Sequence, residues 1–177
     1  MAVCRALTRI AKRASLAACA ASLCFSASAL ALEQKLTAGD GAAGDIFGDS
    51  NSVAVEGDTA VVGAPQNDGA KGAVYVFQRS GDSWSETAKL TASDGAARDQ
   101  LGASVAIDGD TIVSGAITDE VGGNGNQGSV YTFARSGAAA RSETAKLTAS
   151  DGPGGVNLGD SVAIDGDTIL AGAPGAV

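Results

Sequence analysis

Short runs in which apolar residues alternate with small or polar ones follow one another through most of the chain after the first thirty residues. Ser104–Ile107 alternates in this way, and Val74–Phe77 is rich in β-branched and aromatic residues. An alternation with a period of two is typical of β-strands with one face buried, and β-branched and aromatic residues favour strands. No helical periodicity competes with these runs, so the pattern predicts an all-β protein.

The runs recur in a fixed order. The block Lys35–Ala38 returns at Lys89–Ala92 and again at Lys146–Ala149, at spacings of 54 and 57 residues. The segment Ser85–Gly95 is identical to Ser142–Gly152. A repeat of this length indicates a modular array whose units stabilise one another by stacking.

Each unit contains four expected strands. Two of them flank an Asp-Gly pair, as at Asp108-Gly109, which predicts a hairpin with a type I′ turn. The third strand is the Val74–Phe77 run, and the fourth is the run Trp84–Leu90, which ends in the repeated block. Four antiparallel strands in about 40–50 residues correspond to one blade of a β-propeller. The sequence from residue 32 onward holds about 2.7 such units, and propellers usually need at least four.

Two short motifs bracket the predicted hairpin of the first unit, Phe47-Gly48 before it and Gly63-Ala64-Pro65 after it. In this the chain resembles the FG-GAP repeats, the blades of the integrin α-subunit propeller, and is most similar to their bacterial form. The resemblance covers Leu32–Val177, although Leu-Gly replaces Phe-Gly in the second and third units. It implies an extracellular propeller that is used mostly for binding and adhesion.

The first 31 residues have the composition of a secretory signal peptide. Four basic residues lie before residue 14, and the apolar run Ala14–Phe25 is too short to span a bilayer. Small residues follow, and we expect cleavage after Ala31, with Ala29 as the near alternative. A second possibility is lipidation of Cys19, because Leu16–Cys19 resembles a lipoprotein signal box.

The expected division of the chain is therefore a signal peptide, residues 1–31, followed by the repeats, residues 32–177. The repeats fall at approximately 32–87, 88–144 and a partial unit at 145–177. Because the partial unit lacks its last two strands, a blade face and a strand edge would be open. We therefore expect either self-association or missing downstream repeats.

Charge and cysteine content limit the function further. All three cysteines lie in the first 31 residues, so the mature chain would have no disulfide or thiol chemistry. Removal of the four basic residues of the signal would change the formal net charge from −8 to −12. Such a surface repels nucleic acids and anionic membranes, and it suits divalent cations or basic partners.

The residues that could carry chemistry are few. The sequence has no histidine, which excludes Ser-His-Asp and Cys-His catalysis and imidazole zinc sites. No cofactor is expected other than calcium, for which the weak candidates are loop carboxylates: Asp40, Asp45, Asp49, Asp94 and Asp99. The acidic residues of the hairpin turns are too few for a calcium cage, and we interpret them as turn residues. Gly123–Gly128 matches a dinucleotide-binding motif, but a strand follows it where a helix would be required.

Three aromatic residues could form a platform for stacking carbohydrate. Tyr75 and Tyr131 recur at the same station of a strand, which favours packing inside the blade. Arg141 stands where the first unit has Trp84, so not every blade requires this tryptophan and an exposed position is open to it.

The sequence thus predicts an exported, non-enzymatic propeller segment located in the periplasm, on the cell surface or outside the cell. We expect it to bind a protein or glycan as an adhesion module. Two alternatives stay open: an accessory propeller of a secreted hydrolase whose catalytic part lies elsewhere, and a truncated fragment without function.

Overall fold

The protein is all-β. In a computed structural model, residues 4–8, 32–136 and 140–176 are described. The strands are β1 (Cys4–Thr8), β2 (Leu32–Leu36), β3 (Val53–Glu56), β4 (Thr59–Ala64), β5 (Ala73–Ser80), β6 (Ser83–Leu90), β7 (Leu101–Asp108), β8 (Thr111–Ala116), β9 (Ser129–Arg135), β10 (Arg141–Leu147), β11 (Val162–Asp165) and β12 (Thr168–Ala171). Within the described ranges the single helix is α1 (Asn67–Ala70), a four-residue turn with positive φ at Asp68 and Gly69. The prediction of an all-β chain is confirmed, and no helix of the described part is long and apolar enough to cross a membrane.

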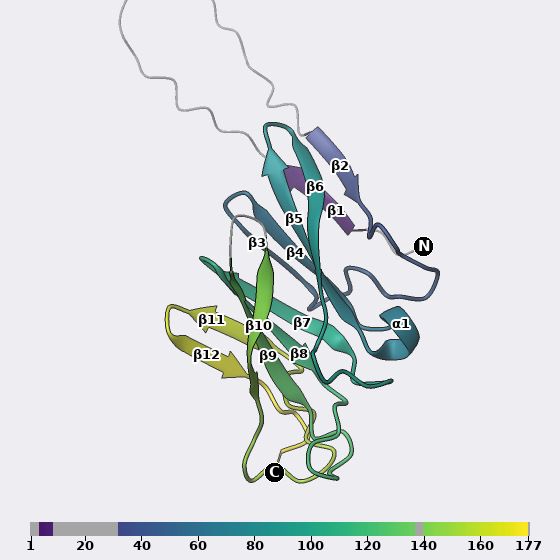
Figure 1. Ribbon diagram of the computed structural model, residues 1–177, viewed down its shortest axis with the longest axis vertical. Helices are drawn as coiled ribbons and strands as arrows, with labels where there is room; N and C mark the ends of the chain where they lie inside the picture. Colours follow the sequence, from purple (N-terminus) through teal and green to yellow (C-terminus); the bar gives the residue numbers. More distant parts are fainter. Residues whose placement is uncertain (1–3, 9–31, 137–139, 177) are drawn as a thin grey trace, which may run out of the picture.

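The strands form two complete four-stranded antiparallel sheets (Figure 1). The first has the order β3-β4-β5-β6 and the second the order β7-β8-β9-β10. A third sheet contains the hairpin β11–β12, and a fourth pairs β1 with β2. The predicted blades of four antiparallel strands are therefore present, and they follow one another as a stacked array with β1–β2 and β11–β12 at its opposite ends.

The N-terminal segment that the sequence assigns to a signal peptide is described only in part. The backbone of β1 pairs with β2, and Arg5 lies opposite Lys35. The expected cleavage positions, Ala29 and Ala31, and the alternative lipidation site, Cys19, lie outside the described residues. The signal peptide stays a prediction.

The hairpin turns differ from the expected type. Asp108 pairs with Thr111, so the two loop residues are Gly109 and Asp110 rather than Asp108 and Gly109. Of these two residues only Gly109 has a positive φ, of 55°. Positive φ at the first loop position alone is the pattern of a type II′ turn, which also matches the right-handed twist of the strands. The prediction of a type I′ turn was wrong, because the strand register is shifted by one residue from the one that the Asp-Gly pair suggested.

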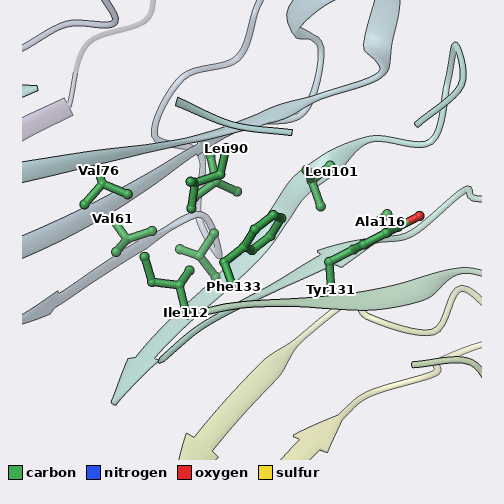
Figure 2. Close-up of a cluster of buried hydrophobic side chains, with 10 residues drawn as sticks. Val61, Val76, Leu90, Leu101, Ile112, Ala116, Tyr131 and Phe133 are labelled. Atoms are coloured by element: carbon green, nitrogen blue, oxygen red, sulfur yellow. The ribbon is translucent and has the colours of Figure 1, made fainter. Parts of the chain in front are cut away.

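Successive residues of each strand point to opposite faces of its sheet, so apolar side chains lie on both faces. The hydrophobic core is therefore formed between neighbouring sheets. In β4, Val61 packs toward the second sheet, whereas Ala60 and Val62 pack toward β2. Figure 2 shows the cluster between the first and second sheets. The first sheet contributes Val61, Val74, Val76 and Leu90 to it, and the second contributes Leu101, Val105, Ile112, Ala116, Tyr131 and Phe133.

The glycines of the two bracketing motifs form the closest contacts between sheets. A methyl group added to Gly63 would lie 2.0 Å from the carbonyl oxygen of Gly102, and one added to Gly115 would lie 1.9 Å from that of Gly159. The glycines of Gly63-Ala64 and Gly115-Ala116 therefore lie against the Leu-Gly glycines of the next unit, Gly102 and Gly159. These two motif positions need glycine because the backbones of adjacent blades meet there.

The aromatic residues are structural. Tyr75 and Tyr131 are fully buried, as predicted, and Phe47 packs edge-on against Tyr75 with ring centroids 5.6 Å apart. Trp84 is also buried, which corrects the expectation of a surface position. Its backbone exchanges two hydrogen bonds with the side chain of Gln34 in β2, and the Arg79 guanidinium lies 5.8 Å from its ring centroid.

Candidate functional site

The loops at one end of the first two sheets carry most of the polar side chains that the sequence singled out. In the first sheet, the Tyr75 hydroxyl and the Lys89 ammonium both donate to the carboxylate of Asp40 in the preceding loop, each at 2.6 Å. In the second sheet, Tyr131 and Lys146 donate to Asp94 at 2.6 and 2.7 Å. These two Asp-Tyr-Lys triads join a loop to the third and fourth strands of the following sheet.

The electrostatics of the triads favour the ionised carboxylates. Hydrogen bonds from Lys89 and Tyr75 hold the pKa of Asp40 below its usual value of 3.8. Burial opposes the charge on Asp94, but hydrogen bonds from Lys146 and Tyr131 outweigh it, so its pKa is also lowered. Burial and the adjacent carboxylate raise the pKa of Tyr75, and the same two causes raise that of Tyr131. The tyrosines are therefore neutral donors at any physiological pH.

The second triad contains an additional acid. Asp119 is buried, receives a hydrogen bond from Ser129 at 2.5 Å, and pairs with Lys146 at 2.7 Å. Burial opposes the charge on Lys146, but its bonds to Asp119 and Asp94 dominate and raise its pKa. Asp119 was not predicted from the sequence. Its only signal is that it follows the Gly-Ala segment at the position where the first unit has Asn67.

The remaining calcium candidates are engaged in loop structure or exposed. Asp45 accepts hydrogen bonds from the backbone N–H of Ala42 at 2.8 Å and from the Asn67 amide at 3.0 Å. Asp99 accepts one from the N–H of Ala96 at 2.6 Å, and Asp49 is exposed. Burial, together with the charges of nearby acids such as Asp119, raises the pKa of Asp99.

The candidate carboxylates are thus dispersed. Within the described part of the chain no group of three or more acidic, histidine or cysteine side chains is arranged to hold a metal ion. Asp40 and Asp94 already neutralise a lysine each, and Asp45 and Asp99 close their own loops. Calcium binding in these loops stays a prediction.

The glycine-rich motif of the second unit is a loop between strands. Residues 123–128 lie between β8 and β9, and no helix follows them in the described segment. The loop packs on the third unit, since the backbone of Gly125 accepts a hydrogen bond from Gly155 at 3.0 Å and Gln127 donates to Ala149 at 2.7 Å. This arrangement agrees with the rejection of a dinucleotide site, which needs a helix N-terminus after the glycines.

A polar groove of about 510 Å³ lies among the loops of the first two units. Its side chains offer a cation, a carboxylate, amides and a hydroxyl. The polar lining residues are Asp45, Gln66, Arg98, Gln100, Thr118 and Asn126.

Arg98 and Gln100 of the groove differ from their counterparts in the first unit, although the aspartate between them recurs. Arg98 stands where the first unit has Gly44, and Gln100 where it has Ile46. Both Arg98 and Gln100 have positive φ, of 79° and 61°, and the Thr118 hydroxyl donates to the backbone oxygen of Arg98. These three residues were not predicted from the sequence. An alignment of the units with one another would have found them, because they are polar residues at loop positions that differ between units.

A family model described as the FG-GAP repeat matches residues 31–77, 84–133 and 142–177. These segments cover most of the chain. They are offset by one strand from the sheets, because the second segment begins in β6 and ends in β9, and the third begins in β10. No curated protein shows significant similarity to the sequence. The repeated strands, the Gly-Gly contacts between sheets and the three matched segments together show that the chain belongs to the FG-GAP repeat family.

Proposed function

We propose that this chain is a non-enzymatic binding module of an exported β-propeller, and that the groove among the loops of the first two units holds its ligand. The observation that carries the proposal is the location of Arg98, Gln100 and Thr118, which line the groove and differ from their counterparts in the first unit. The loops are held by two complete sheets, and binding residues commonly lie on loops that a rigid scaffold positions.

The chemistry of the groove favours a polar ligand. Arg98 supplies a positive charge, and Gln66, Gln100 and Asn126 supply amides that both donate and accept hydrogen bonds. Glycans and extended polar segments of proteins present hydroxyl, amide and carbonyl groups that such a lining can satisfy. Family membership supports the same class of function, because FG-GAP propellers are often extracellular or adhesive modules.

Substitution in the groove tests the binding role. Arg98→Gly places at this position the residue that the first unit carries, so it removes the charge without straining a backbone that has a positive φ. Arg135→Ala is the matched control, because Arg135 forms an exposed ion pair with Asp110 at 2.9 Å and does not line the groove.

The probes are a glycan microarray and a displayed random-peptide library. We expect the wild-type chain to retain ligands that the Arg98→Gly variant loses by tenfold or more, while the control retains them within about twofold. Equal binding by both variants, or no selective retention on either probe, would refute a ligand site in this groove.

Export is tested by expression of the full chain in a Gram-negative host and by the mass of the extracytoplasmic product. Cleavage after Ala31 or Ala29 supports the proposal, and a product carrying diacylglycerol on Cys19 identifies the lipoprotein form. Retention of the intact chain in the cytoplasm would contradict export.

A further inference from the structure

The exposed large hydrophobic residues of the described segments gather at the two ends of the array. They are Ile46, Val53, Val55, Leu147 and Leu170. The leading face is the side of the first sheet turned away from the second, and it exposes Val53 and Val55. The trailing face is the side of the β11–β12 hairpin turned away from the second sheet, and it exposes Leu170.

Each exposed residue has a buried counterpart inside the array. Leu170 is 68% exposed, whereas Val61 and Val113, which occupy its position in β4 and β8, are both 0% exposed. Val53 is 46% exposed, and its counterpart in the next unit, Val105, is 6% exposed. Burial therefore depends on whether a neighbouring sheet is present and not on the residue itself.

A hydrogen-bond series between hairpin turns follows the same order. Glu56 of the first unit accepts a bond from the N–H of Gly109 in the second, at 2.6 Å. Asp108 of the second unit accepts one from Gly166 in the third, also at 2.6 Å. Continued in both directions, the series places an exposed acceptor, Asp165, at the trailing face and an exposed donor, the N–H of Gly57, at the leading face.

The two faces also correspond in the strands that they leave uncovered. At the leading end, β2 contacts β6 at one edge of the first sheet, where Leu36 is buried. It leaves Val53 and Val55 exposed on β3, the strand at the opposite edge. At the trailing end, β11 and β12 are the counterparts of β3 and β4. The β11–β12 hairpin of another copy would therefore fit against the uncovered β3 side of the leading face, next to β2.

We propose that the leading face of one copy of this chain packs against the trailing face of a second copy and continues the contact that already joins the first two sheets. Asp165 of one copy accepts the Gly57 N–H of the other, and Val53 and Val55 pack against the β11–β12 hairpin. The interface is heterologous, so it can repeat into a closed ring or an open assembly.

The test uses sedimentation velocity of the full chain over a wide concentration range. We expect the wild-type mass to rise with concentration. Val55→Asp closes the leading face and Leu170→Asp closes the trailing face, so each variant alone stays monomeric. An equimolar mixture restores a 1:1 dimer, because each variant supplies the face that the other lacks. Ser83→Asp, which adds the same charge at the exposed first residue of β6, associates like the wild type.

A second pair of variants does not place a charge in an apolar surface. Asp165→Ala removes the acceptor of the series and raises the dissociation constant about tenfold, whereas Asp167→Ala removes an equal charge in the same turn and changes it less than about twofold. A wild-type chain that is monomeric at every concentration, single variants that still associate, a mixture that stays monomeric, or equal effects of these two alanine variants would each overturn the proposal.

Discussion

Replacement of Gly63 by alanine should separate the first two sheets. The added methyl carbon would lie 2.0 Å from the carbonyl oxygen of Gly102 and 2.8 Å from its carbonyl carbon, whereas side-chain Cβ atoms essentially never approach another heavy atom within 3.0 Å. Both neighbours are backbone in packed strands, so the sheets must move apart by about 1 Å. A gap of that size removes a quarter to a half of the dispersion energy of the contacts it opens. We expect a loss of about 3 kcal/mol of unfolding free energy, at the upper end of the range for overpacked cores.

The control is Gly57→Ala. No atom lies within 4 Å of the methyl group that this substitution adds, and the only cost is the φ of 54°, which should be about 1–2 kcal/mol. Urea unfolding followed by Trp84 fluorescence and by far-ultraviolet circular dichroism measures both variants. An unfolding free energy of Gly63→Ala equal to or above that of Gly57→Ala would refute the view that the glycine contact holds the sheets together.

Two further predictions concern the charged side chains behind the loops. Lys146→Met leaves the buried Asp119 without its cation and should cost about 2 kcal/mol in a urea titration, while Lys89→Met, whose partner Asp40 is exposed, should cost less than about 1 kcal/mol. Equal losses would show that burial of Asp119 is unimportant. Asp99→Asn should stabilise the fold at pH 7, because the folded-state pKa of Asp99 is raised. Asp99 contributes fully to the unfolding free energy below its unfolded-state pKa near 3.8, where it is protonated. This contribution is lost as pH rises through the higher pKa of the folded state. Urea midpoints of this variant and the wild type should therefore differ at pH 7 and converge at pH 3, and a gap that widens in acid would contradict the sign.

Much of the strand structure could be predicted from local pattern alone. The run Val74–Phe77 alternates between two buried faces, with Val74 and Val76 in one cluster and Tyr75 and Phe77 in the other. β-branched and aromatic residues with a period of two specify such a strand without knowledge of its neighbours. The turn type was less accessible, because a shift of one residue in strand pairing moved the loop from Asp108-Gly109 to Gly109-Asp110.

The candidate site was predictable only in part. Asp40 and Asp94 were recognised as recurring acids, but their lysine partners, Lys89 and Lys146, lie 49 and 52 residues further along the chain. The replacement of Trp84 by Arg141 in the second unit left an exposed position open, whereas the side chain of Gln34, 50 residues away, helps to hold Trp84 in the core. No local pattern contains these contacts.

The sequence by itself determined the repeat, the strands, the hairpins and the family, since each follows from residues that are close together and recur at a fixed order. The tertiary structure decided which residues of different repeats meet. It places Gly63 against Gly102, pairs the triad carboxylates with lysines about fifty residues away, and exposes Val53 and Leu170 while burying their counterparts. The physical reason is that both faces of a blade carry apolar side chains. Its composition is nearly the same in every unit, and only the presence of a neighbouring sheet determines whether a given face is core or surface.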